Sequence, residues 1–264
     1  MLYIKNVYKT FNPGTVNEKK ALIDINLHLN PGDFITVIGG NGAGKSTLLN
    51  MIAGVYPIDN GSIQLKNVNL TNMYEHQRAK YIGRVFQDPL KGTAAGMEII
   101  ENLALANRRG ERRGFAWGVK KEEKEAYRGL LGELDLGLES RLNVKAGLLS
   151  GGQRQALTLL MATLKKPDLL LLDEHTAALD PKTAEKVLQI TENVVQKDSL
   201  TTIMITHNMR HAIAMGNRLI MMMDGQIIYD ISGEEKQNLQ VKDLLERFES
   251  SRGGEFANDR MLLS

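Results

Sequence analysis

GGNGAGKST, residues 39–47, follows the pattern G-x-x-x-x-G-K-[ST]. The stretch comes directly after FITVI (34–38), a short apolar run typical of a strand buried on both faces. It leads into KSTLLNMIAGVY, whose apolar residues fall on one helical face before Pro57. A glycine-rich turn between a buried strand and a helix is the context in which backbone N–H groups and the positive helix end bind phosphate. The stretch therefore predicts a nucleotide phosphate site.

The side chains of this turn have separate chemical roles. Lys45 is expected to reach the β- and γ-phosphates, and the Ser46 hydroxyl is expected to ligate Mg²⁺. This pattern alone leaves kinase, GTPase and ATPase open. The predicted nucleotide-binding residues of the turn are Gly39, Gly40, Asn41, Gly42, Ala43, Gly44, Lys45, Ser46 and Thr47.

Two adjacent carboxylates, Asp173 and Glu174, follow the apolar run Leu169–Leu172. Ligands of open α/β sheets lie beyond the carboxyl ends of the strands. We therefore expect Asp173 to complete the Mg²⁺ shell and Glu174 to polarise a water for attack on the γ-phosphate. The alternative is that both carboxylates only cap the strand. After a phosphate-binding turn, the pair favours hydrolysis of the nucleotide.

Composition excludes several classes of protein. The 264 residues contain no cysteine, which excludes thiol catalysis, a disulfide framework and thiolate zinc, and fits a reducing compartment. With 33 basic and 31 acidic residues, the chain has no global field that would select nucleic acid. Its longest apolar runs are far shorter than a bilayer, and its first residues lack a secretion signal. We expect a soluble chain.

Predicted strands and helices alternate along the chain around a helical insertion. This order indicates an α/β domain with a helical subdomain at about 88–164. We expect the main domain to span residues 1–235, with a C-terminal helix and tail at 236–264 that frays after Ser251. A basic stretch, Arg108 to Lys124, is interpreted as a solvated loop between helices, in preference to a nucleic-acid patch.

LLSGGQRQ (148–155) resembles the signature of the ATP-binding cassette (ABC) family. The other family elements follow the family's order. Gln87 in VFQD resembles the glutamine loop, LLLLDE (169–174) the second nucleotide motif, AALD (177–180) the D-loop, and His207 the switch histidine. The resemblance covers roughly residues 1–235, and the ordered set is far more specific than any one motif.

The resemblance implies a P-loop NTPase fold with a mainly parallel core sheet, an N-terminal antiparallel β subdomain and an inserted helical subdomain. It implies ATP and Mg²⁺ as ligands, with Gln87 near the metal and His207 contacting the γ-phosphate. Two subunits would sandwich two ATP molecules, each phosphate turn facing the partner's signature. That signature contributes Ser150, Gly151, Gly152 and Gln153, and Asp180 couples the two sites.

One aromatic residue is expected to stack on adenine. Phe11 lies where the family places this residue, and Tyr8 and Tyr3 are rivals. A core position for Phe11 is the alternative.

Three functional classes fit a single ABC cassette. A DNA-acting relative would need a long coiled coil between Lys45 and Asp173, and ribosome-acting relatives carry two cassettes, so these are disfavoured. The favoured class is the ATPase subunit of an importer whose permease is a separate chain. The runner-up is a motor that acts on a membrane partner without moving a solute, as in cell division or lipoprotein release.

Within importers, the sequences around these motifs resemble those of ATPases of aromatic amino acid (tryptophan or tyrosine) importers. The implied partners are a second ATPase subunit, identical or a paralogue, an integral membrane permease, and indirectly an extracytoplasmic solute-binding protein; no nucleic acid is expected. The implied location is peripheral, at the cytoplasmic face of the cell membrane. DPLKGTAAGMEIIENL, after Gln87, is expected to form the groove for the permease.

His175 departs from the family, which usually has proline at this position. Proline would stiffen the turn after Glu174 by fixing φ. A catalytic His175 would duplicate His207, so we interpret it as a turn residue that touches the partner subunit. His175→Pro is then expected to keep most activity.

Overall fold

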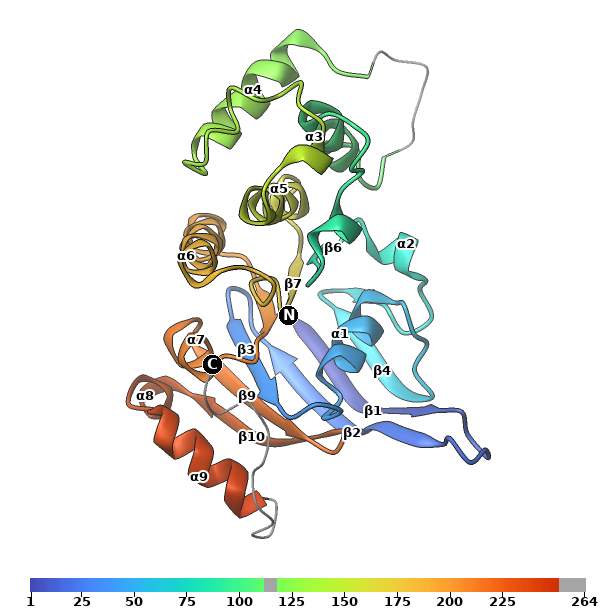
Figure 1. The fold of residues 1–264 in the computed structure, drawn as a ribbon. Coiled ribbons are helices and arrows are strands. Elements are labelled where there is room, and N and C mark those ends of the chain that lie inside the picture. The colour runs from blue at the N-terminus through green and yellow to red at the C-terminus, as the bar shows by residue number, and fades with distance from the viewer. Residues whose placement is uncertain (112–117, 252–264) are drawn as a thin grey trace. The chain divides into compact units, whose positions relative to one another are not determined.

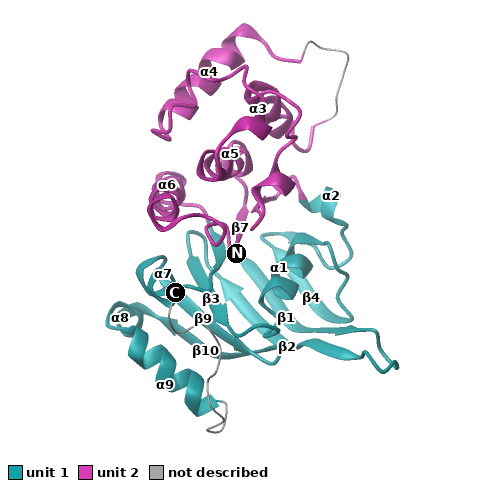
Figure 2. Ribbon diagram, in the orientation of Figure 1, with its two compact units in different colours: residues 1–78, 201–264 teal, residues 79–200 magenta. Residues whose placement is uncertain are grey.

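The structure is a computed structural model that describes residues 1–111 and 118–251. The chain forms two compact units, coloured separately in Figure 2. Unit 1 comprises residues 1–78 and the chain from Thr201 onward, and unit 2 comprises Ala79–Leu200. Both contain strands and helices, as Figure 1 shows.

The N-terminal strands of unit 1 form an antiparallel sheet of order β2-β1-β4-β5. Alternating apolar side chains such as Ile4, Ile25 and Ile63 are buried on one face, which is the period-2 pattern of a half-covered sheet. The strands are β1 (Leu2–Phe11), β2 (Lys19–Leu29), β4 (Asn60–Leu65) and β5 (Val68–Asn69). The expected N-terminal antiparallel subdomain is confirmed.

The core of unit 1 is built on β3, a strand buried at every position. It pairs in parallel with β8 and with β9, and β9 forms an antiparallel hairpin with β10. These strands are β3 (Phe34–Gly39), β8 (Thr202–Ile205), β9 (Arg218–Met223) and β10 (Gln226–Ser232). The helices of unit 1 are α1 (Lys45–Ala53), α2 (Glu75–Arg78), α7 (Met209–Ala214), α8 (Gly233–Gln237) and α9 (Val241–Ser251).

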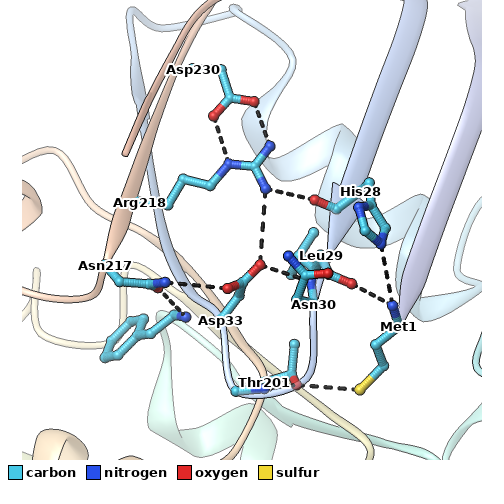
Figure 3. Close-up of polar contacts among 11 residues, drawn as sticks. Met1, His28, Leu29, Asn30, Asp33, Thr201, Asn217, Arg218 and Asp230 are labelled. Carbon is cyan, nitrogen blue, oxygen red and sulfur yellow. Dashed lines mark hydrogen bonds and ion pairs between the residues drawn. The ribbon is translucent and has the colours of Figure 1, made fainter. Parts of the chain in front are cut away.

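Arg218 joins these strands at one end, as Figure 3 shows. Its guanidinium donates to both carboxylate oxygens of Asp230 on β10, and Nη1 donates to the His28 carbonyl of β2 at 2.6 Å. Asp33 lies 4.0 Å from the same Nη1. Such a two-pronged contact with a carboxylate fixes geometry as well as charge. Arg218 therefore fixes the β9–β10 hairpin against the N-terminal sheet within unit 1.

Unit 2 holds a parallel pair of strands and most of the helices. Its elements are β6 (Ile82–Val85), η1 (Pro89–Gly92), α3 (Ile99–Asn107), α4 (Lys121–Gly132), η2 (Ala146–Leu148), α5 (Gly151–Thr163), β7 (Leu169–Asp173) and α6 (Pro181–Asp198). The expected helical subdomain, about 88–164, falls within this unit. Parallel core strands with covering helices confirm the predicted α/β class.

Two sequence predictions fall partly outside the described residues. Residues 112–117 of the basic stretch lie outside them, and so does the tail after Ser251. At the ends of the basic stretch, Arg108 pairs with Glu123 at 3.1 Å. Within the described ranges, no helix is both long and apolar enough to cross a membrane.

Candidate nucleotide-binding and hydrolysis site

The phosphate-binding turn connects β3 to α1 and depends on glycine at two places. Gly39 has φ +151°, and a Cβ there would lie 2.2 Å from the Met222 carbonyl oxygen. Gly44 has φ +99°, and a Cβ there would lie 2.6 Å from the Ala21 carbonyl oxygen. Side chains are therefore excluded by backbone on both sides of the turn. The two glycines of the pattern are therefore required by steric fit as well as by the chemistry of phosphate binding.

Lys45 begins α1, and its side chain folds over the turn. It is 5% exposed, and Nζ donates to the carbonyls of Gly39 at 2.7 Å and Gly40 at 3.0 Å. Ser46 follows and is exposed at the start of the helix. An ammonium in a glycine-rich turn at a helix N-terminus is suited to bind phosphate oxygens.

The switch histidine lies beside this turn. β3 and β8 pair in parallel with Val37 opposite Ile205, so Gly39, at the end of β3, and His207, two residues beyond β8, lie at the carboxyl ends of adjacent strands. Gly39 and His207 both line one small cavity. The complete lining is Ile38, Gly39, Thr206, His207, Met209 and Phe248. Unit 1 thus brings the histidine and the phosphate turn together.

Phe11 is the aromatic residue best placed toward the turn. In the β1–β2 pairing it lies opposite Lys19, and paired residues project to the same face of a sheet. The Lys19 ammonium lies 3.3 Å from where a Cβ at Gly42 would be. Tyr56 contacts the Phe11 ring edge to face, with ring centroids 5.2 Å apart. Tyr3 instead stacks on His28, with centroids 4.3 Å apart.

The carboxylate pair lies at the end of β7 in unit 2. β6 and β7 pair in parallel with Val85 opposite Leu172, so Gln87, two residues beyond β6, and Glu174, one residue beyond β7, lie at the carboxyl ends of adjacent strands. Asp173 Oδ2 lies 3.6 Å from Arg84 Nη2, and the Arg84 guanidinium lies 4.5 Å from the Phe86 ring centroid. Unit 2 thus brings the glutamine and both acids to the same strand ends.

Glu174 has an unusual backbone. Its φ is +47°, in the left-handed region, and its residue exposure is 8%. Non-glycine residues in this region are rare and cost free energy, so surrounding contacts must hold them there. The predicted base therefore sits at a strained position immediately beyond its strand.

The signature begins α5 with a reciprocal cap. The Ser150 hydroxyl accepts from the Gln153 N–H at 3.3 Å, and the Ser150 N–H donates to Gln153 Oε1 at 3.3 Å. Gly152 packs against α6, where its added Cβ would lie 2.1 Å from Thr183 Cγ2. The signature turn and the start of α6 are therefore fixed against each other within unit 2.

Asp180 of the D-loop caps the N-terminus of α6. Its Oδ1 accepts from the Thr183 N–H at 3.1 Å. Hydrogen bonds from the Thr183 side chain and backbone hold the pKa of the Asp180 carboxyl below its usual value. Asp180 thus stays ionised while it caps the helix.

His175 differs from its sequence-based interpretation. Its residue exposure is 2%, and Nε2 lies 3.0 Å from Thr191 Oγ1 on α6. His175 lies in a turn, as interpreted, but its side chain is buried within unit 2, which does not fit a contact with a partner subunit.

Three residues near the site were missed by sequence reasoning: Lys19, Tyr56 and Arg84. Strand alternation could have indicated Lys19, which faces the same way as Phe11 once the hairpin register is known. Arg84 and Tyr56 carry no local motif, because their contacts depend on which segments become neighbours in the fold.

The donor chemistry fits Mg²⁺. Ser46, Gln87 and Asp173 offer a hydroxyl, an amide oxygen and a carboxylate, the oxygen ligands that Mg²⁺ takes together with substrate phosphates. Among residues 1–111 and 118–251, no cluster of three or more His, Cys, Asp or Glu side chains could hold a metal by itself.

Comparisons with known proteins point to one family. A family model described as ABC transporter matches residues 22–177. The tyrosine transport ATP-binding protein of Clostridioides difficile (strain R20291) is 42% identical over 250 residues, which is 94% of this chain and 99% of the relative. A phosphonates import ATP-binding protein of Alcaligenes faecalis is 32% identical over 87% of this chain and 82% of its own length.

Solved structures agree. The dimeric post-hydrolysis state of the ATP-binding cassette MJ0796, bound to ADP and Pi, matches with a TM-score of 0.75 and 29% identity, over 88% of this chain and 98% of that one. The ADP conformation of MJ1267, a cassette of an ABC transporter, matches with a TM-score of 0.76 and 28% identity, over 97% and 99% of the two chains.

Proposed function

Since this chain belongs to the ABC transporter family, we propose that it powers the uptake of an aromatic amino acid, tyrosine foremost, through a separate permease. It is the ATP-binding and ATP-hydrolysing subunit of an ABC importer. The observation that carries the proposed solute is the 42% identity to a tyrosine transport ATP-binding protein along nearly the whole of both chains.

The proposed chemistry divides among the predicted residues. The turn 39–47 binds the phosphates, with Lys45 neutralising charge on the β- and γ-groups. Ser46, Gln87 and Asp173 hold Mg²⁺, which when bound offsets negative charge on the transferring phosphoryl group. Support comes from their donor chemistry and their positions at strand and helix ends.

Glu174 is the proposed base. It accepts a proton from the water that attacks the γ-phosphorus in line with the leaving β-phosphate oxygen, and His207 donates a hydrogen bond to a γ-phosphate oxygen. Phe11 stacks on adenine. The shared cavity of His207 and Gly39 and the strand-end position of Glu174 support these roles.

The working unit is proposed to be a dimer. One chain carries one phosphate turn and one signature, so a second copy or a paralogue completes each site with its own Ser150–Gln153 segment. The capped start of α5, a glycine-rich turn at a helix N-terminus, supports this because it offers N–H donors for the γ-phosphate. Asp180 couples the two sites.

The proposed setting follows from the importer role. The dimer works at the cytoplasmic face of the membrane on an integral permease, which receives solute from an extracytoplasmic binding protein. Residues 1–235 form the ATPase domain in this proposal, and 236–264 a C-terminal helix and tail.

The proposal is tested with the chain reconstituted in vesicles together with the permease and binding protein encoded beside it. ATPase activity is measured with tyrosine, tryptophan, phenylalanine and methionine in turn, and uptake of labelled tyrosine is measured in parallel. We expect stimulation by tyrosine and ATP-dependent uptake, with methionine as the inactive control. Stimulation by methionine alone would overturn the solute assignment, and stimulation without uptake of any solute would favour the motor function.

A further inference from the structure

His175 has no role in the proposed hydrolysis, although it lies between residues that do, in the segment Asp173–Asp180. It lies directly after the proposed base, Glu174, and its imidazole points inward. Nε2 lies 3.0 Å from the hydroxyl of Thr191, a residue 0% exposed in the interior face of α6. Water therefore has little access to compete for this hydrogen bond.

The direction of this hydrogen bond follows from Thr191. Its hydroxyl has a single proton, and it donates that proton to the Val187 carbonyl at 2.8 Å. Toward His175, the same oxygen can only accept. Nε2 of His175 therefore carries a proton and donates to Thr191 Oγ1, which gives a chain of two hydrogen bonds from imidazole to hydroxyl to backbone carbonyl.

The backbone next to His175 needs such an anchor. Glu174 has φ +47°, and a left-handed non-glycine residue persists only where its neighbours are fixed. On one side, β7 is held by its pairing with β6. On the other side, the Glu174 carbonyl accepts from the Ala177 N–H at 3.0 Å, and the His175 side chain is bound to α6.

We propose that the His175–Thr191 hydrogen bond positions the catalytic glutamate. It holds Glu174 in its left-handed conformation by tying the next residue to the third turn of α6. His175 is a positioning residue, and this role rests on the proposed role of Glu174 as base. A family member with proline at this position would restrict the same turn through φ, so histidine replaces a backbone constraint with a side-chain one.

The test removes the hydroxyl and keeps the packing. Thr191→Val replaces oxygen with a methyl group, and Thr163→Val is the matched control. Thr163 is 5% exposed in α5, and its hydroxyl likewise donates to the carbonyl four residues earlier, Leu159, at 2.9 Å. The two variants lose equivalent helix contacts, but only Thr191→Val loses the bond to His175.

We expect Thr191→Val to lower kcat for ATP hydrolysis about tenfold, because a displaced base loses alignment with the attacking water. KM for ATP should stay within about twofold, since the phosphate turn is untouched. Thr163→Val should lower the melting temperature by about as much as Thr191→Val does, but it should leave kcat within about twofold. Thr191→Ser, which keeps the hydroxyl, should restore kcat.

Changes at His175 give the second arm. His175→Gln keeps an N–H donor at the reach of Nε2 and should retain most of kcat, whereas His175→Leu should match Thr191→Val. Equal kcat for Thr191→Val and Thr163→Val would overturn the anchor. Glu174→Gln is measured alongside: if it hydrolyses ATP at the wild-type rate, the base assignment itself is wrong, and if it is inactive while Thr191→Val is unimpaired, only the anchor is wrong.

Discussion

At the scale of single residues, the strained backbone of Glu174 is held by the contacts around it. The left-handed conformation of Glu174 costs about 1–2 kcal/mol for a residue with a Cβ. Contacts on both sides of the residue offset this cost. Gly39 and Gly44 avoid the same cost in the phosphate turn, where backbone atoms of Met222 and Ala21 leave no room for a Cβ. The two glycines therefore avoid the strain by residue type, whereas the strain at Glu174 is offset by the contacts around it.

The assignment of the adenine contact can be tested at Phe11. Phe11→Ala should raise KM for ATP about tenfold, because stacking on a base is worth about 1–3 kcal/mol. kcat should change little, since the hydrolytic groups are separate from the ring. Steady-state ATPase kinetics measure both values. Tyr3→Ala is the control, because Tyr3 stacks on His28; an equal rise in KM for Tyr3→Ala would contradict the assignment.

Lys19 gives a second residue-scale prediction. Its ammonium lies beside Gly42 of the phosphate turn, so Lys19→Met should weaken nucleotide binding several-fold, more at low salt than at high salt. Titration with a fluorescent ATP analogue at two ionic strengths measures this. Lys20→Met, the exposed neighbour in sequence, should bind normally. A salt-independent effect, or an equal effect of both variants, would remove Lys19 from the site.

Sequence reasoning was strongest where chemistry is local. The phosphate turn, the acids at the end of β7 and His207 all lie at ends of strands that the apolar runs before them predict. It failed for the His175 side chain, because the direction of that side chain depends on α6 packing nearby. It missed Arg84 for a similar reason, since the contact with Asp173 exists only through strand pairing.

At the scale of elements, two short helices that follow functional loops are each capped at the C-terminus by a buried cation. α1 follows the phosphate turn, and Arg78 Nη1 donates to its last carbonyls, Met51 at 2.7 Å and Ile52 at 2.8 Å. α7 follows His207, and Lys236 Nζ donates to the carbonyls of Ala212, Ile213 and Met215 at 2.7–3.0 Å. A cation at a helix C-terminus satisfies carbonyls that have no partner within the helix.

Both cations keep their charge near neutral pH. Burial lowers the pKa of Arg78 to about 10 and that of Lys236 to about 8. Each is almost fully buried, so removal of the side chain would leave buried carbonyls without a donor.

The Arg78 cap predicts a large loss of stability. Arg78→Met should lower the free energy of unfolding by about 3 kcal/mol, because hydrogen bonds from a charged group are lost and the carbonyls of α1 stay buried. Urea unfolding followed by circular dichroism measures the change. Arg128→Met is the control, since Arg128 is exposed and pairs only locally with Glu125. Equal midpoints for the two variants would contradict the cap.

These caps also mark a limit of sequence reasoning about elements. The apolar pattern predicted the helix at α1 and its end before Pro57. Nothing in the sequence near α1 indicates that an arginine some 25 residues later completes its C-terminus. Element existence depends on local periodicity, whereas the contacts that fix element ends depend on tertiary structure.

At the scale of the whole molecule, each of the two units places functional groups at the carboxyl ends of its strands, and in the proposed dimer each site is completed by a second chain. Glu174→Gln should bind ATP and Mg²⁺ but fail to hydrolyse it, because the amide cannot accept the proton of the attacking water. The bound nucleotide should then hold the dimer together. Size-exclusion chromatography with ATP and Mg²⁺ should show a dimer, and with EDTA a monomer.

A matched variant separates the dimer from general association. Ser150→Arg in the Glu174→Gln background places a bulky cation at the start of α5, where the partner's nucleotide is proposed to lie, and should elute as a monomer with ATP. A dimer of this double variant, or a Glu174→Gln protein that stayed monomeric yet hydrolysed ATP normally, would contradict the proposed arrangement.

We propose that the segment after Gln87, expected from the sequence to form the groove for the permease, connects ATP hydrolysis with transport. Asp88 caps η1 by accepting from the Leu90 N–H at 2.9 Å, and Leu90 is 51% exposed, an unusual state for a leucine. Lys91, next to it, is also exposed. A charge reversal at an exposed position changes stability by no more than about 0.5 kcal/mol. Lys91→Glu should therefore leave the fold and the ATP site intact.

We expect Lys91→Glu to retain the ATPase activity of the isolated subunit within about twofold, because no proposed catalytic group changes. In vesicles with the permease, uptake should fall at least about tenfold. The reversed charge disrupts the docking surface, because like charges that meet across it cost several kcal/mol. Lys5→Glu, on the exposed side of β1, is the control and should transport normally. Loss of ATPase activity together with uptake would place the effect of Lys91 in the ATP site and remove this surface from coupling.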